Sequence, residues 1–172
     1  DVFEAAGDDA INLGLGQPDL PTPKHARQAA VDAIEAGKAD DYTENKGRPA
    51  LRDAITAKYE RNQGLDIDPD DVIATSGGSE ALHLALAAHV DAGEEVIVPD
   101  PGFVSYDALT TMVGGETVPV GLRADMTLDP AAIEKAITDE TAAFVINSHA
   151  NPTGAVGSEY DIRAFARSAD EH

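Results

Sequence analysis

The chain has 172 residues, of which 42% are hydrophobic and 26% are charged, proportions typical of a globular domain and not of a disordered segment. Asp and Glu total 32 against 12 Lys and Arg, and the formal net charge of −20 disfavours nucleic acid and anionic membranes as partners. The sequence contains no cysteine, no secretion signal and no apolar run near the ~20 residues that span a bilayer, so we expect a cytoplasmic protein.

The acidic residues are spread through the chain and do not form one tail, with clusters at 8–9, 40–41, 66–71 and 94–95. A dispersed acidic surface repels itself less when salt screens the charges. We therefore predict a folded domain adapted to high salt. The chain begins at Asp1 and not at a methionine, and we expect it to be a fragment or a processed product.

Residues 11–23 are dense in Gly and Pro and are predicted to be irregular. Helices are predicted next over 24–37 and 49–62, with Gly37 and Gly64 as their stops. From Asp71 onward, strands are predicted to alternate with helices. The strands are 72–75, 95–98, 116–120 and 142–146, and the helices are 80–92, 103–113, 130–137 and 159–169. This alternation is typical of βαβ units and predicts an α/β fold with a parallel sheet.

A Gly-rich turn, Thr75–Ser79, connects a predicted strand to a predicted helix. Glycines allow the backbone N–H groups to approach a ligand, and a helix N-terminus favours negative charge. The turn can therefore hold phosphate without Lys or Arg. The alternative is an ordinary helix cap, with Ser76 or Ser79 as the capping residue.

Two further features follow predicted strands. Phe103 comes after Asp100-Pro101-Gly102 and can stack on a flat ring, or it can be an ordinary core aromatic. Asn151 begins the segment Asn-Pro-Thr-Gly and offers an amide, although such a segment taken alone is more often a turn. Because ligands bind at the carboxyl ends of parallel strands, the turn, the aromatic and the amide together predict a site for pyridoxal phosphate.

Five segments, in this order, resemble the class I/II aminotransferases of the aspartate aminotransferase superfamily, which are fold type I pyridoxal phosphate enzymes. They are GLGQPDLPTP (14–23), YTENKGRPALR (42–52), TSGGSEAL (75–82), EEVIVPDPGFVSY (94–106) and VINSHANPTGAV (145–156). The resemblance implies a three-layer α/β/α large domain with a parallel-rich sheet, present incompletely in residues 41–172. Residues 1–40 would then be an N-terminal segment and first helix that belong to the small domain and substrate lid.

The resemblance also implies roles for particular residues. Gly77, Gly78 and Ser79 would hold the cofactor phosphate. Phe103 would stack on the pyridine ring, and Asn151 would bind the phenolic oxygen, with both also close to the substrate.

Two residues of the N-terminal part are matched as well. Gly16 belongs to the segment that would close over the substrate. Tyr42 would reach the cofactor phosphate of the other subunit, which implies a homodimer with shared sites.

The sequence departs from the family pattern N-S-P-N-N-P-T-G, because His149 and Ala150 replace a Pro and an Asn. The family also uses a Schiff-base lysine, an aspartate at the pyridinium nitrogen and a carboxylate-binding arginine, all located after this segment. None of the five lysines present matches the Schiff-base motif. They are Lys24, Lys38, Lys46, Lys58 and Lys135.

We therefore predict a pyridoxal-phosphate-dependent transaminase that moves an amino group between an amino acid and a 2-oxo acid, with this chain as its N-terminal part and inactive alone. One alternative is a non-catalytic fragment or a regulatory or binding module with the same fold. Another is a different fold type I activity, such as a C–S lyase or a decarboxylase.

Overall fold

The computed structural model describes residues 11, 16 and 18–172, and the chain divides into two compact units, Asp1–Asn45 and Lys46–His172. The described part of the first unit contains helix α2 (Lys24–Glu35), which confirms the first predicted helix. Gly37 follows with a φ of 66°, a conformation that favours glycine and ends the helix as predicted. The functional division proposed at residues 40 and 41 stays a prediction.

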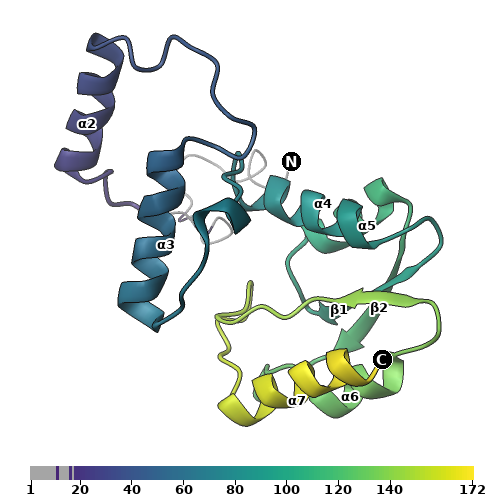
Figure 1. Ribbon diagram of the computed structural model, residues 1–172. Helices are drawn as coiled ribbons and strands as arrows, with labels where there is room; N and C mark the ends of the chain where they lie inside the picture. The colour runs from purple at the N-terminus through teal and green to yellow at the C-terminus, as the bar shows by residue number, and fades with distance from the viewer. Residues whose placement is uncertain (1–10, 12–15, 17) are drawn as a thin grey trace. The chain divides into compact units, whose positions relative to one another are not determined.

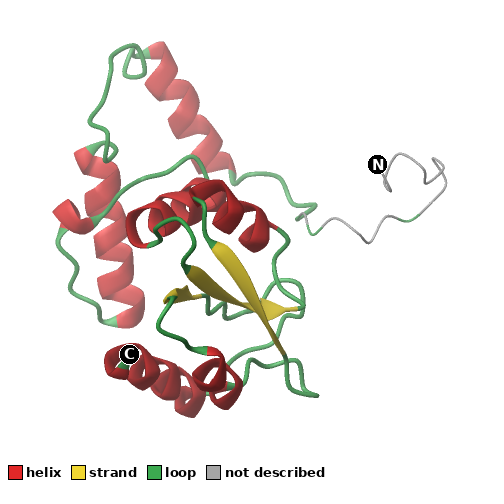
Figure 2. Cartoon of the chain, turned by 90° about the vertical axis from the view of Figure 1, so that its right-hand side faces the viewer, coloured by secondary structure: helices red, strands yellow, loops and turns green. Residues whose placement is uncertain are grey.

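The second unit is built around a three-stranded parallel sheet (Figures 1 and 2). Its strands are β1 (Glu95–Asp100), β2 (Glu116–Gly121) and β3 (Thr141–Phe144), in the spatial order β2-β1-β3. Its helices are α3 (Pro49–Gln63), the 3₁₀ turn η1 (Pro69–Asp71), α4 (Gly78–His89), α5 (Ser105–Val113), α6 (Pro130–Ala136) and α7 (Glu159–Glu171). The predicted parallel α/β arrangement is confirmed.

The sheet is covered on both faces, by α4 and α5 on one side and by α6 and α7 on the other (Figure 1). Strand β1 explains why both faces need a cover, since successive side chains of a strand point to opposite faces of the sheet. Val96 and Val98 pack in the cluster that contains Leu86 of α4, whereas Ile97 packs in the cluster that contains Phe165 of α7. An apolar strand buried on both faces requires a helix layer on each side, and the three-layer α/β/α prediction is confirmed.

The strand predicted at residues 72–75 is wrong: the sheet formed by the described residues does not include this segment. The backbone N–H of Ala74 donates instead to the carbonyl oxygen of Lys46, at 2.9 Å. A short apolar run becomes a strand only when another strand pairs with its backbone, and composition alone cannot supply that partner. The predicted helix 103–113 also starts two residues later, at Ser105.

Candidate functional site

The turn before α4 has the geometry of an anion-binding helix start. Gly77 is the N-cap residue with φ 89° and ψ 172°, and Gly78 is the first residue of the helix. No side chain makes a capping hydrogen bond there, so the alternative of a Ser76 or Ser79 cap is wrong. The hydroxyl of Thr75 steadies the turn by donating to the carbonyl oxygen of Gly77 at 3.0 Å. The first backbone N–H groups of α4 therefore lack the side-chain partner that most helix starts have.

The space in front of this turn is open. A Cβ atom placed on Gly77 or on Gly78 would meet no other atom within 4 Å. The carboxylate of Glu80 is directed at the turn and accepts a hydrogen bond from the backbone N–H of Ser76. A negative side chain here is favoured by the positive end of the helix dipole. The turn thus already has one negative group beside it, and the binding of a cofactor phosphate there stays a prediction.

Phe103 lies between β1 and α5, half-buried, and packs against the cluster that contains Leu86 and Val98. Its ring makes an edge-to-face contact with Tyr106, with centroids 5.6 Å apart and planes at 82°. A cavity of about 290 Å³ borders Phe103. Asp100, Tyr106 and Thr117 also line it. The residue is therefore a core aromatic and also lies at the carboxyl end of a strand, so the two interpretations of the sequence do not exclude each other.

Asn151 is exposed on the loop that follows β3. Backbone bonds close this loop: the N–H of Ala150 donates to Ala155 O at 2.9 Å, and the N–H of Gly154 donates to Ala150 O at 2.7 Å. The hydroxyl oxygen of Thr153 accepts the N–H of Ala155 at 3.2 Å. The closure uses the backbone of Ala150 and not its side chain, so these two bonds do not depend on which side chain stands at this position.

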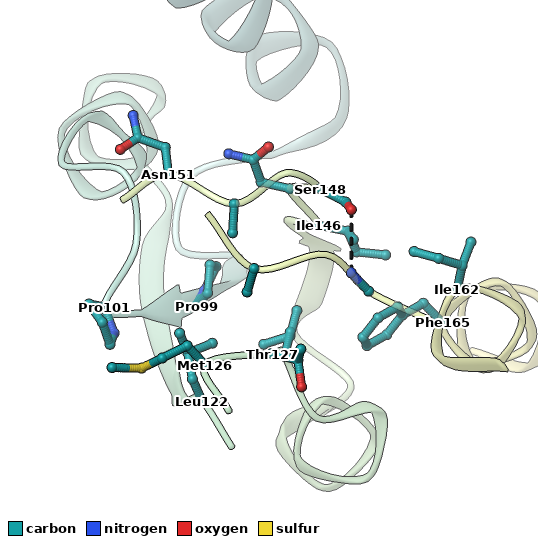
Figure 3. A pocket seen from close by; sticks show the side chains of 15 residues that line it. Pro99, Pro101, Leu122, Met126, Thr127, Ile146, Ser148, Asn151, Ile162 and Phe165 are labelled. Carbon is teal, nitrogen blue, oxygen red and sulfur yellow. Dashed lines mark hydrogen bonds between the residues drawn. The ribbon is translucent and has the colours of Figure 1, made fainter. Parts of the chain in front are cut away.

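A small cavity lies below this loop (Figure 3). Residues from the ends of all three strand segments line it, including Pro99 near the end of β1, Pro101 after β1, Leu122 after β2, and Asn151. Its volume of about 30 Å³ holds a few water molecules at most and not an aromatic ring. The amide of Asn151 points away from it (Figure 3), so this cavity is not the predicted ring site.

Beside the cavity lies an ion cluster of three residues, which we call the arginine clamp: Arg123, Asp129 and Asp161. The guanidinium of Arg123 contacts Asp161 at 3.1 Å through Nη1 and Asp129 at 3.2 Å through Nη2. Asp161 is buried and also accepts a 2.7 Å hydrogen bond from the hydroxyl of Ser158. That hydrogen bond, opposed by burial and reinforced by Arg123, holds the pKa of Asp161 below its ordinary value.

The arginine clamp is not among the sites predicted from the sequence. One part of it could have been predicted from the sequence, because Ser158 and Asp161 have the three-residue spacing of a capping box. The structure shows that they form this reciprocal cap at the start of α7. Arg123 lies 38 residues before Asp161, and no local pattern connects the two.

Gly16 and Tyr42 both lie in the first unit. Gly16 is exposed, outside regular secondary structure, and Tyr42 has a fully exposed side chain at 106%. Their roles at the substrate and at a partner's cofactor stay predictions.

Across the described ranges, no three His, Asp or Glu side chains come together in a way that could bind a metal ion. Within the same part of the chain, every helix is too short or too polar to cross a membrane.

Comparisons with known proteins agree on one family. The family model described as aminotransferase class I and II matches residues 8–172. A probable aspartate aminotransferase of Methanocaldococcus jannaschii is 39% identical over 100% of this chain and 46% of its own length.

Two solved structures are similar over nearly all of the chain. The aspartate aminotransferase of Thermus thermophilus with maleate is 41% identical with a TM-score of 0.88, over 92% of this chain and 42% of that one. The aromatic aminotransferase of Pyrococcus horikoshii is 36% identical with a TM-score of 0.91, over 99% of this chain and 46% of that one. The chain thus spans less than half the length of the relatives that it matches.

Proposed function

The chain belongs to the aminotransferase class I and II family, whose members depend on pyridoxal phosphate, and we propose that the full-length protein is a transaminase. It would move an amino group between an amino acid and a 2-oxo acid. When bound, the cofactor supplies an electron-withdrawing ring that stabilises negative charge developing on the substrate. The residues of this chain bind and orient that cofactor.

One observation carries the proposal: α4 begins at two glycines with no side-chain cap and with open space in front. The backbone N–H groups of Gly78 and Ser79 and the helix dipole would hold the phosphate there. The positive φ of Gly77 turns the backbone into the helix without a Cβ in the way of the ligand. A phosphate held by backbone groups needs no lysine, and none is present in this turn.

Phe103 and Asn151 would orient the ring. Phe103 is braced by Tyr106 and by the core, which limits its motion and presents a fixed aromatic face. The amide of Asn151 would donate to the phenolic oxygen of the cofactor and lie close to the substrate carboxylate, on a loop closed by its own backbone bonds. Gly16 would contribute to the cover over the substrate.

We propose that none of the five lysines of this chain holds the cofactor covalently. Lys46, for example, is occupied in donating to the carbonyl oxygen of Asp70 at 2.6 Å. The test is borohydride reduction of the full-length protein loaded with pyridoxal phosphate, followed by peptide mapping. We expect the modified lysine outside residues 1–172, and a label on any of the five would contradict this assignment.

The proposed donor is aspartate, because two of the three relatives described above are named aspartate aminotransferases. The third is an aromatic aminotransferase, so an aromatic amino acid is the competing donor. Purified full-length protein with 2-oxoglutarate and either aspartate or tyrosine decides between them by the rate of glutamate formation. Release of CO₂ from either amino acid without glutamate would favour the decarboxylase alternative, and release of sulfide and ammonia from added cysteine would favour the C–S lyase alternative. If the full-length protein neither binds pyridoxal phosphate nor shows any of these activities, the non-catalytic module would be favoured.

A homodimer is part of the proposal, because Tyr42 would serve the cofactor of the partner subunit. Its fully exposed side chain is available for such a contact. Mixing Tyr42→Ala and Asn151→Ala variants under exchange conditions tests this: hybrid dimers with one intact site should regain activity. Mixed variants as inactive as either one alone would contradict a shared site. We further propose a cytoplasmic protein of a salt-adapted cell, on the strength of the −20 net charge.

A further inference from the structure

We infer that Arg123 is a positioning residue for the loop that presents Asn151, and that it acts through Asp161 and the first turn of α7. The inference builds on the role given to Asn151 under the proposed function. In the part of the chain that the structure describes, the ion pairs of Arg123 go to Asp129 and Asp161 and not to a residue assigned to the cofactor, so its effect would be on the geometry of the loop.

The arginine clamp connects segments that are distant in sequence. Arg123 and Asp129 belong to the connection from β2 to α6, whereas Asp161 is in the first turn of α7. Asp129 also caps α6, accepting the N–H of Ala131 at 3.1 Å. One guanidinium therefore joins the first turns of α6 and α7, and only the two-pronged geometry of arginine allows both contacts at once.

The Asn151 loop runs directly into the turn that the clamp holds. Ser158 caps α7 through Asp161, and the preceding residue, Gly157, donates its N–H to the hydroxyl oxygen of Ser148 at 3.4 Å (Figure 3). This bond draws the two ends of the loop together. The position of the loop's second end is thus set by Asp161, which in turn is held by Arg123.

The backbone of Arg123 also bonds to the segment below the loop, independently of its guanidinium. The N–H of Arg123 donates to Thr127 O and the N–H of Met126 donates to Arg123 O, both at 2.9 Å. Met126 and Thr127 line the small cavity on the side opposite the loop (Figure 3). The backbone of Arg123 thus orders the segment below the loop, whereas its guanidinium holds the helix start at which the loop ends.

Burial makes the connection sensitive to mutation. The side chain of Asp161 is 8% exposed and that of Arg123 is 37% exposed. A buried carboxylate that loses a charged partner must find another or move toward water. Movement of Asp161 would carry the first turn of α7 and the end of the loop with it.

The test compares Arg123→Gln with Arg163→Gln in the full-length protein. Arg163 pairs with Glu159 on the same helix, but both side chains are exposed, at 71% and 81%, so this control removes an ion pair without touching the clamp. In hydrogen exchange, Arg123→Gln should speed the loop amides of Ala150 and Gly154 about tenfold. The amide of Val145, bonded to Ile97 O in the sheet, should not change.

A cofactor measurement separates positioning from general stabilisation. Arg123→Gln should weaken pyridoxal phosphate binding about five- to tenfold, and should weaken it little further in an Asn151→Ala background. Arg123→Lys, which can reach one carboxylate at a time, should fall between the wild type and Arg123→Gln.

Unchanged loop exchange in Arg123→Gln, or equal acceleration at Val145, would overturn the inference. Full additivity of the two substitutions would overturn it as well. If Asn151→Ala alone leaves cofactor affinity unaltered, the proposed function of Asn151 fails instead, and the exchange data still decide whether Arg123 positions the loop.

Discussion

The carboxylate of Glu80 accepts a hydrogen bond from the backbone N–H of Ser76, across the turn at which we place the cofactor phosphate. The two residues are four positions apart, on either side of the glycine pair that starts α4. A fixed negative charge therefore lies next to a proposed anion site. It prepares the turn by holding its backbone, but it also repels the ligand.

The first prediction concerns this repulsion. Glu80→Gln removes the charge and keeps a hydrogen-bond acceptor, so affinity of the full-length protein for inorganic phosphate and pyridoxal phosphate should rise about three- to tenfold. Calorimetric titration measures it. Asp170→Asn, an exposed carboxylate on α7 beyond the other face of the sheet, is the matched control. Equal affinities for both variants would place the phosphate elsewhere.

The second prediction separates the two glycines. Gly78 is in the helix and has open space at its Cβ position, so Gly78→Ala should raise the free energy of unfolding by about 0.5 kcal/mol. The same methyl group would intrude on the phosphate and lower pyridoxal phosphate affinity at least tenfold. Gly77→Ala, at φ 89°, should instead destabilise by about 1–2 kcal/mol. Urea unfolding and cofactor titration measure the two effects. A Gly78→Ala variant with unaltered affinity would contradict the cradle.

The third prediction concerns pH. The folded protein lowers the pKa of Asp161, with Ser158 as the largest stabilising contact, so the folded state keeps this carboxylate ionised when the unfolded chain has begun to protonate. The free energy of unfolding that ionised Asp161 contributes is therefore fully present above the ordinary Asp pKa of about 3.9. It is lost as the pH falls through the lower pKa that Asp161 has in the folded protein. Asp161→Asn should be less stable than the wild type at pH 7, and the difference should shrink below about pH 4. Urea unfolding over this range, with Asp170→Asn as control, measures it. A difference that stays constant with pH would contradict the charged role.

The fourth prediction concerns salt. With a net charge of −20, the folded chain repels itself, and screening at 1 M salt shortens the range of that repulsion to about 3 Å. The melting temperature should therefore rise between 0.1 and 2 M KCl. An uncharged osmolyte at matched water activity is the control, because it leaves charge repulsion in place. Greatest stability at low salt would exclude the salt-adapted interpretation.

Several features could be predicted from local sequence because their causes are local. Glycine stops, Pro49 at the start of α3 and the alternation of apolar runs place the helices and three strands within a few residues of their observed bounds. The parallel sheet follows from that alternation, and the order of five segments identifies the family. Gly77, Gly78, Phe103 and Asn151 stand out because each follows an apolar run, where α/β proteins place ligands.

Pairings between distant residues were decided only by the tertiary structure. Residues 72–75 have the composition of a strand, but a strand needs a partner whose backbone is supplied from elsewhere. Ser76 and Ser79 are ordinary capping residues by type, yet neither caps α4, because Gly77 occupies the cap position.

The arginine clamp could not be predicted from the sequence for the same reason. The capping box at Ser158 and Asp161 can be recognised in the amino-acid sequence, because that motif lies within one helical turn. The sequence does not indicate that Arg123 contacts Asp161, because this contact depends on α6 and α7 packing side by side on the sheet. Sequence alone therefore determines the local elements and the family, whereas the partners of each charged or hydrogen-bonding side chain depend on which distant elements the core brings together.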